Sequence, residues 1–187
     1  PSIGTGTWTQ TSGPGTSTFD PNANTYNAIV TVSEYGTYTF TWTEATETCS
    51  NSSTVTVNFY EPPVANAGTG GNNCGLEFYL NGSLNVGTGT WTKYSGPGNA
   101  TFTPDNHAPD AQVRVSAYGT YVFRWTVVNG PCSHSSNVTV VFIQQPAANA
   151  GSGGGECDND YDLNASPAIG TGTWTKMSGP GNAIFTP

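Results

Sequence analysis

The sequence GTGTWT, at residues 87–92, occurs three times in this chain, and its other copies are residues 4–9 and 170–175. The tryptophans of the three copies stand 83 residues apart. Each copy is followed two residues later by Ser-Gly-Pro-Gly, and then by a segment that ends in Phe-(Asp/Thr)-Pro. Self-similarity at a fixed period is the sequence signature of a tandem array. The chain is therefore expected to consist of repeated folding units.

The period divides the chain into one complete repeat and two incomplete repeats. Repeat 1 comprises residues 1–62 and is incomplete at its N-terminus, repeat 2 comprises residues 63–146 and is complete, and repeat 3 comprises residues 147–187 and is incomplete at its C-terminus. We expect the chain to be a segment of a longer array. The linkers at residues 60–63 and 144–146 are short and contain proline, which fixes φ, so they predict a semi-rigid rod.

The alternation of apolar and polar residues predicts β-strands. Repeat 2 contains seven alternating or turn-bounded segments, at residues 64–68, 76–80, 88–92, 99–103, 111–116, 121–127 and 138–142. Seven short strands separated by Gly, Pro and Asn turns are typical of an immunoglobulin-like β-sandwich. The predicted fold class is therefore all-β, a tandem array of seven-stranded sandwiches. The positions expected to face the core on the last three strands are Ala111, Val113, Val115, Tyr121, Phe123, Trp125, Val127, Val138, Val140 and Phe142.

Composition and charge exclude several classes of partner. The formal net charge is −8, and the chain has only four Lys and Arg residues. Binding of nucleic acid or of anionic lipid requires clustered basic side chains, so neither is expected. No apolar run of about 18 residues is present, so no membrane insertion is expected. Charged residues make up 9 %, and Thr-rich strands take their place on the solvent faces, which favours an extracellular, cell-surface location.

The four cysteines follow the same period, and their pairing is open. Cys49 and Cys132 occupy one repeat position, and Cys74 and Cys157 occupy the other. Periodic pairs favour disulfide bonds in an oxidising compartment. The first candidate is Cys74 with Cys132, although alternating strands place these two at opposite ends of the unit, beyond the ~7 Å that a disulfide spans. The alternatives are Cys74 with the Cys132 position of the next repeat, and Cys49 with Cys74 together with Cys132 with Cys157.

Several motifs resemble those of a known repeat family. They are Pro-Ala-Ala-Asn-Ala-Gly (146–151), Leu-Asn-Gly-Ser (80–83), Gly-Asn-Ala-Thr-Phe-Thr-Pro (98–104), Tyr-Gly-Thr-Tyr (118–121), Asn-Gly-Pro-Cys (129–132) and Ser-Asn-Val-Thr-Val (136–140). Together they resemble the PKD-like, immunoglobulin-like repeats of giant surface proteins of Bacteroidota. Such arrays often precede a gliding-motility-associated sorting domain of the type IX secretion system. The resemblance covers the whole chain and implies an extracellular stalk or adhesin, but no sorting or catalytic domain lies within it.

The aromatic residues that recur with the period are interpreted as structural core. Tyr38 and Tyr121 begin a strand after Gly-Thr, which predicts a tyrosine corner whose hydroxyl bonds to nearby backbone. A tryptophan on the third strand of an immunoglobulin-like sandwich is ordinarily buried. The alternative is that these rings are exposed and stack on sugars. The residues assigned to the core are Trp8, Trp91, Trp174, Trp42, Trp125, Tyr38 and Tyr121.

Acidic and amide oxygens offer weak candidates for a Ca²⁺ site. The densest carboxylate cluster is Glu156, Asp158, Asp160 and Asp162. Ca²⁺ takes six to eight oxygen ligands, and this cluster could supply some of them. The cluster does not recur with the period, and two of its members fit the solvent face of a strand. Asn66 and Asn149 are further candidates at the junctions between repeats. No other cofactor is expected.

No recurrent set of reactive residues is present, so the chain is not expected to be an enzyme. His107 and His134 correspond to Asn24 and Asn51 one repeat earlier and have no recurrent partner. Ser-Gly-Pro-Gly lacks the lysine and the following helix of a phosphate-binding loop. The cysteine and histidine spacings do not match a zinc site.

The sequence therefore favours a non-catalytic stalk or fibre segment that holds a binding tip away from the cell. Its expected partners are neighbouring repeats of the same chain, further copies of the chain in a filament, and an unknown surface or glycan ligand at a tip outside this segment. The alternatives are a glycan- or surface-binding module and an accessory repeat of a secreted polysaccharide-degrading enzyme.

Overall fold

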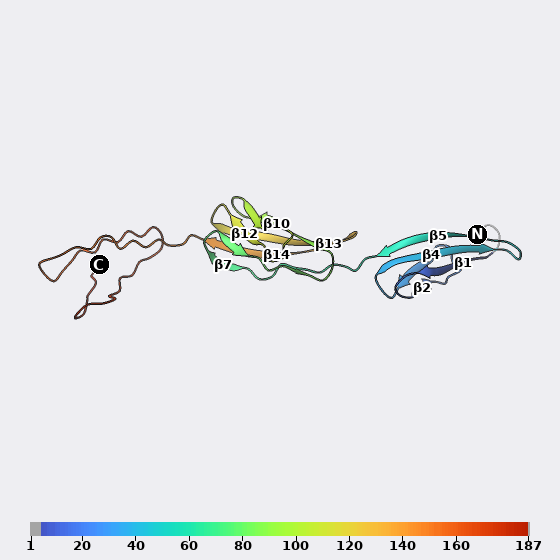
Figure 1. The fold of residues 1–187 in the computed structure, drawn as a ribbon, viewed down its shortest axis with the longest axis horizontal. Coiled ribbons are helices and arrows are strands. Elements are labelled where there is room, and N and C mark those ends of the chain that lie inside the picture. Colours follow the sequence, from blue (N-terminus) through green and yellow to red (C-terminus); the bar gives the residue numbers. More distant parts are fainter. Residues whose placement is uncertain (1–4, 187) are drawn as a thin grey trace.

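The computed structural model describes residues 5–186, and the strands of these residues form two successive β-sandwiches of the immunoglobulin-like class (Figure 1). The described residues contain no helix, so none of them forms a helix long and apolar enough to cross a membrane. The strands of repeat 1 are β1 (Thr5–Ser12), β2 (Ser17–Asp20), β3 (Ile29–Val32), β4 (Gly36–Ala45) and β5 (Ser50–Phe59). The strands of repeat 2 are β6 (Ala65–Asn66), β7 (Gly71–Cys74), β8 (Glu77–Tyr79), β9 (Ser83–Leu84), β10 (Thr88–Ser95), β11 (Ala100–Thr103), β12 (Gln112–Val115), β13 (Gly119–Asn129) and β14 (Cys132–Ile143).

Repeat 2 is a sandwich of two principal sheets. One sheet has the order β10-β13-β14-β7 and the other β11-β12-β8, and β6 pairs separately with β9. Neighbouring strands are antiparallel except β7, which runs parallel to β14. Strands occur at each of the seven segments predicted from the sequence, and β7 and β9 are additional. The backbone immediately before β7 approaches β14 closely, since a Cβ placed at Gly70 would overlap the carbonyl of Thr139.

The core of repeat 2 lies between these sheets and is apolar. The predicted inward positions on β12, β13 and β14 are confirmed, because each of those side chains is 4 % exposed or less. The buried cluster consists of Ala65, Ala67, Leu80, Trp91, Ala111, Val113, Val115, Tyr121, Phe123, Trp125, Val127, Val138, Val140 and Phe142. Its members come from both sheets and from the β6 region, so the core of repeat 2 is closed within that repeat.

Repeat 1 follows the same plan in the same register. β1 pairs with β4 so that Trp8 lies opposite Trp42, and β10 pairs with β13 so that Trp91 lies opposite Trp125. Both pairs carry an irregularity at the same place, two residues after the tryptophan. However, residues 63–83 of repeat 2 have no counterpart in repeat 1, because position 84 corresponds to residue 1. Repeat 1 therefore lacks the strands equivalent to β6, β7, β8 and part of β9.

Repeat 3 forms no strand among its described residues, 147–186. Residues 171–178 correspond to β10, which in repeat 2 pairs with β13. The counterparts of β12, β13 and β14 would follow residue 187, so the partner strands are not in this chain. One backbone bond of the repeat is nevertheless present, from the amide of Ser166 to the carbonyl of Asn149 (2.9 Å).

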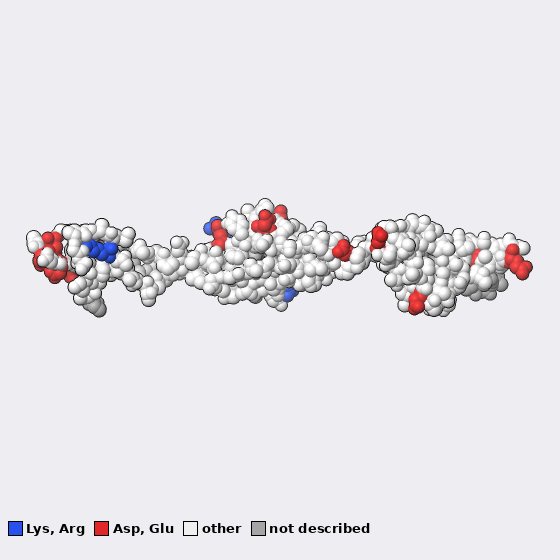
Figure 2. All heavy atoms as spheres, turned by 90° about the horizontal axis from the view of Figure 1, so that it is seen from below, with Lys and Arg blue, Asp and Glu red and all other residues white. Residues whose placement is uncertain are grey.

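The three repeats follow one another in a single line (Figure 1). Repeat 1 lies at one end, repeat 2 in the middle, and the residues of repeat 3 at the other end. Figure 2 shows that charged side chains are few and scattered on the visible face of repeats 1 and 2. This face of repeats 1 and 2 is therefore mainly uncharged.

Candidate functional site: the junction between repeats

The two tryptophans of repeat 2 are fully buried and hydrogen-bonded. The rings of Trp91 and Trp125 are 4.9 Å apart between centroids, and both side chains are 0 % exposed. The indole Nε1 of Trp91 donates to the carbonyl of Pro109 (3.2 Å), and that of Trp125 donates to the carbonyl of Ser83 (3.1 Å). These rings have no free face on which a sugar could stack.

The equivalent tryptophans of repeat 1 are only half-buried, which differs from the core assignment. Trp8 and Trp42 keep the same ring pairing, at 5.2 Å, and Trp8 keeps the matching bond from Nε1 to the carbonyl of Tyr26 (3.2 Å). The Nε1 of Trp42 instead donates to Oε1 of Glu44 (3.1 Å), because the counterpart of Ser83 precedes residue 1. The rings are partly exposed because residues equivalent to 63–83, which complete the sandwich of repeat 2, are not present in repeat 1.

The tryptophan of repeat 3 also departs from the core assignment. Trp174 is half-buried and lines a hollow with Ala148 and Pro167. In repeat 2 the corresponding ring is enclosed by β12, β13 and β14, and repeat 3 has no counterpart of these strands. Its partial exposure therefore follows from the absent strands.

Tyr38 and Tyr121 have the geometry of tyrosine corners. Both are 0 % exposed. The hydroxyl of Tyr38 donates to the carbonyl of Glu34 and that of Tyr121 to the carbonyl of Ala117, each at 3.0 Å. Each hydroxyl thus bonds to the backbone four residues upstream, which fixes the turn that enters β4 or β13.

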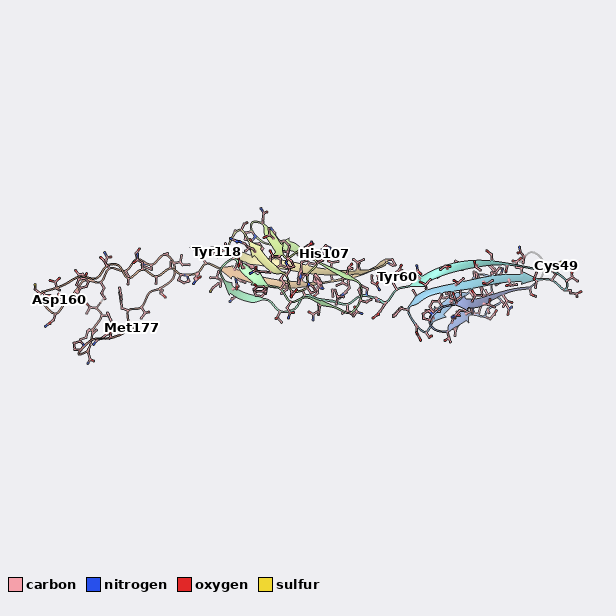
Figure 3. All side chains as sticks on the ribbon, viewed as in Figure 1. Cys49, Tyr60, His107, Tyr118, Asp160 and Met177 are labelled. Atoms are coloured by element: carbon pink, nitrogen blue, oxygen red, sulfur yellow. The ribbon has the colours of Figure 1, made fainter. Side chains whose placement is uncertain are left out.

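The carboxylate cluster at residues 156–162 does not form a metal site in this structure. Among residues 5–186, no group of three or more His, Cys, Asp or Glu side chains is placed to hold a metal ion. The acidic cluster lines an open hollow, and Figure 3 shows Asp160 at the far end of repeat 3. Asn66 and Asn149 are engaged otherwise, because their Oδ1 atoms accept from the amides of Gly68 and Gly151 (2.9 Å each).

No catalytic arrangement is evident in the described part of the chain. No polar or charged side chain is fully buried there. His107 is exposed and lies 3.9 Å from Asp105, between Nδ1 and Oδ1. His134 has a structural contact, because its Nδ1 accepts from the amide of Ala65 (2.9 Å).

All four cysteines are free in this structure, and the geometry of repeat 2 contradicts the first candidate disulfide, Cys74 with Cys132. Cys74 lies opposite Ile143 in the β7–β14 ladder, and Ile143 ends β14. Cys132 begins the same 12-residue strand. Residues in a strand advance about 3.4 Å each, so Cys74 and Cys132 are roughly 37 Å apart, at opposite ends of repeat 2. A disulfide needs Cα atoms within about 7 Å.

The feature that joins the repeats is an ordered junction that sequence reasoning did not identify. Its linker is residues 60–63, and its contacts come from the loop after β9 and from the hairpin tip, residues 129–132, between β13 and β14. Nδ2 of Asn129 donates to the carbonyl of Glu61 (2.9 Å). Asn85 forms three bonds: Nδ2 donates to Oε1 of Glu61 (2.9 Å) and to the carbonyl of Pro62 (3.4 Å), and Oδ1 accepts from the amide of Val64 (2.7 Å).

An aromatic contact completes the junction. Gly130 in the hairpin tip has a φ of +57°, and a Cβ placed there would overlap the ring of Tyr60. Glycine is therefore required both by the backbone conformation and by the close approach of this ring. Figure 3 labels Tyr60 at this junction and Cys49 at the opposite end of repeat 1. The sequence signal was an aromatic residue, Tyr60, two positions before Pro62, and an Asn-Gly turn in the next repeat.

A hollow of about 580 Å³ occupies the end of repeat 2 that faces repeat 3. Cys74 lines it together with Glu77, Tyr79, Arg114 and Tyr118. Tyr79 is 70 % exposed and Tyr118 41 %. Glu77 and Arg114, which lie opposite each other on β8 and β12, form an ion pair in its lining, at 3.5 Å between Oε1 and Nη1. This end of repeat 2 is therefore open and carries an exposed thiol.

Comparison with known proteins gives structural likeness only. No protein-family model matches the chain, and no curated protein matches it. A structure of three titin immunoglobulin domains, a glutamate-to-alanine variant, is 14 % identical with a TM-score of 0.38 and covers 76 % of this chain and 56 % of that one.

Two further solved structures are similar over much of this chain. An endo-fucoidan hydrolase of glycoside hydrolase family 107, MfFcnA4, is 16 % identical, covers 77 % of this chain and 24 % of that one, and has a TM-score of 0.31. The S-layer protein rSbsC is 14 % identical, covers 74 % and 20 %, and has a TM-score of 0.30. The chain thus spans about half of the titin structure and a quarter or less of the other two.

Proposed function

We propose that this chain is a non-catalytic stalk segment of an extracellular surface fibre, in which successive sandwiches act as spacers. Support comes from the 83-residue period, the closed apolar core of repeat 2, and the resemblance of its motifs to PKD-like repeats of Bacteroidota surface adhesins. In this role the repeats hold a binding tip, outside the chain, away from the cell. Secretion by the type IX system and a part in gliding adhesion belong to the same proposal.

The observation that carries the proposal is the ordered junction. A flexible connection would leave its linker free of contacts, but here Glu61 accepts hydrogen bonds from Asn129 and Asn85 of repeat 2 and the ring of Tyr60 packs on Gly130. The linker also contains two prolines, one of which, Pro63, is buried. Few soft torsions remain between the two sandwiches, so their long axes stay aligned.

Small-angle X-ray scattering tests the proposal on the intact chain. β14 spans 12 residues, so one repeat is about 40 Å long. Three units in line form a rod of roughly 120 Å with a radius of gyration of about 35 Å, whereas a compact globule of 187 residues has one of about 16 Å. A value near that of the globule would refute the stalk.

A junction variant sharpens the test. The double variant Tyr60→Ala, Asn129→Ala removes the ring contact and one linker hydrogen bond, so we expect a smaller radius of gyration and a broader distance distribution. Tyr26→Ala is the matched control, because Tyr26 is 70 % exposed and lies outside the junction. If the double variant scatters like the control, the junction does not set the alignment.

A second candidate function, saccharide binding, is favoured by one observation. The hollow at the end of repeat 2 presents Tyr79 and Tyr118 beside the polar groups of Glu77, Gln112 and Arg114. Exposed aromatic faces with nearby hydrogen-bonding groups are suited to sugar rings. A glycan array of the intact chain, compared with Tyr79→Ala, distinguishes this role: binding that the variant loses supports it, and no binding excludes it.

A further inference from the structure

The cysteines of each repeat lie at its two ends, and this placement has a consequence for the array. The cysteine that ends β7, Cys74, lies at the end of repeat 2 facing repeat 3, and we call this position the β7 cysteine. The cysteine that begins β14, Cys132, lies at the end facing repeat 1, and we call this position the hairpin cysteine. Within a repeat the two cannot meet, because β14 separates them by roughly 37 Å.

The junction between repeats 1 and 2 shows which cysteines face each other. In repeat 2 the β7 cysteine pairs in the sheet with Ile143. The residue 83 positions before Ile143 is Tyr60, so a β7 cysteine of repeat 1 would stand beside Tyr60, one strand spacing of about 4.8 Å away. The ring of Tyr60 packs on Gly130, which is two residues from Cys132. The β7 position of one repeat and the hairpin cysteine of the next therefore lie at the same junction, separated by one strand spacing, one ring contact and the two residues from Gly130 to Cys132.

The remaining pairing considered from the sequence is excluded by the same geometry. Cys49 lies just before the 10-residue strand β5, and Tyr60 lies just after it. Cys49 is thus at the far end of repeat 1, away from the junction, as Figure 3 shows. A bond from Cys49 to Cys74 would have to span two repeats.

We propose that each β7 cysteine forms a disulfide bond with the hairpin cysteine of the repeat that follows it, so that a covalent bond crosses every junction. This inference rests on the proposed function only in that repeats follow one another in register. Both thiols are accessible, since Cys74 is exposed and Cys132 is half-exposed. Each complete repeat carries one cysteine of each kind, so no thiol inside an array is left unpaired.

The chemistry is thiol–disulfide exchange with an external disulfide. The two thiols lose two protons and two electrons as the sulfur–sulfur bond forms, and the disulfide oxidant takes both up and is reduced to two thiols. Neither Cys74 nor Cys132 finds its partner in this chain, because the two required positions fall before residue 1 and after residue 187. All four thiols are accordingly free here.

The decisive experiment completes repeat 1. A copy of residues 63–83 is placed directly before Pro1, which adds one β7 cysteine 83 positions before Cys74 and restores the strands that cover Trp8 and Trp42. The chain is oxidised in a glutathione redox buffer, the free thiols are alkylated, and the crosslinked peptides are identified by mass spectrometry without reduction. We expect one crosslink, between the added cysteine and Cys132, with Cys49, Cys74 and Cys157 alkylated.

Two controls accompany this chain. Cys132→Ser, and an extension that carries serine in place of the added cysteine, should each remove the crosslink without changing the fold. Tryptophan fluorescence reports the fold, because burial of Trp8 and Trp42 shifts the emission to the blue. If the emission shifts but the added cysteine stays free or pairs elsewhere, the proposal is overturned.

A second chain covers the case in which repeat 1 is not completed. Here residues 63–145 are duplicated in register, so that two closed repeats follow each other, and the crosslink must join Cys74 of the first copy to Cys132 of the second. Its absence there also overturns the proposal. Small-angle scattering of either chain tests the stalk proposal independently of the disulfide proposal. A compact particle refutes the stalk, while the mass spectrometry still decides the cysteine pairing. A rod whose thiols stay free refutes only the pairing.

Discussion

Replacing Gly89 by alanine should destabilise repeat 2 far more than the equivalent change at Gly6 destabilises repeat 1. A Cβ at Gly89 would overlap the six-membered ring of Trp125, and a Cβ at Gly6 would overlap that of Trp42 in the same way. The two collisions are matched, but the surroundings differ. Trp125 is 0 % exposed, whereas Trp42 is half-buried and has solvent on one side.

The expected magnitudes follow from what each ring loses when it moves. Inserting a methyl group into a closed core costs about 1–3 kcal/mol. Withdrawal of Trp125 also breaks its bond to the carbonyl of Ser83, which adds about 0.5–1.5 kcal/mol. We therefore expect about 3 kcal/mol for Gly89→Ala. Trp42 can move toward solvent, so Gly6→Ala should cost about 1 kcal/mol or less, below the range for a closed core.

Native-state hydrogen exchange with mass spectrometry measures both effects in one molecule. Peptides from β13 report repeat 2 and peptides from β4 report repeat 1. A loss of about 3 kcal/mol corresponds to roughly 100-fold faster exchange in β13, because each 1.4 kcal/mol is tenfold. Gly153→Ala is the control, since no atom lies within 4 Å of a Cβ there. Equal effects at Gly89 and Gly6 would refute the argument that the missing strands leave Trp42 free to move.

Two further predictions concern the tyrosine corner and metal dependence. Tyr121→Phe removes the 3.0 Å hydrogen bond from the buried hydroxyl to the carbonyl of Ala117, so urea titration should show a loss of about 1 kcal/mol in the free energy of unfolding. The control, Thr120→Ala, changes an exposed neighbour and should leave that free energy nearly unchanged. An unchanged urea midpoint for Tyr121→Phe would contradict a structural role for the hydroxyl. Removal of Ca²⁺ with EDTA should leave the melting temperature of the chain unchanged, because residues 5–186 bring together no group of three or more His, Cys, Asp or Glu side chains that could hold a metal ion. A clear drop in the melting temperature, measured by calorimetry, would instead indicate an ion bound by backbone or amide oxygens.

Strands with regular alternation were predictable from the sequence, and β7 was not. In β13 every second residue is apolar and buried, so periodicity alone places Tyr121, Phe123, Trp125 and Val127 inside. The residues of β7 are Gly-Asn-Asn-Cys, which have no alternation and low β-propensity. This strand exists because its backbone finds the free edge of β14, a contact between residues far apart in the sequence.

Burial of the periodic aromatic residues depended on more than the repeat pattern. Trp42 and Trp125 occupy the same repeat position, yet only Trp125 is enclosed, because the covering segment at residues 63–83 has no counterpart in repeat 1. The junction was also hidden from periodicity. Asn129 and Gly130 predicted a turn, but their contacts with Glu61 and Tyr60 depend on how one repeat is placed against the next.

The parallel pairing of β7 with β14 determines how repeat 2 carries mechanical tension. The chain enters repeat 2 at the end facing repeat 1 and leaves it at Ile143, at the other end. Once the two-residue pairing of β6 with β9 has opened, a pull on both ends drives β7 and β14 in opposite directions along their own axes, and the ladder between them is loaded in shear. Its hydrogen bonds must then rupture together instead of one after another. A sandwich built in this way resists stretching along the fibre more strongly than one whose terminal strands peel apart.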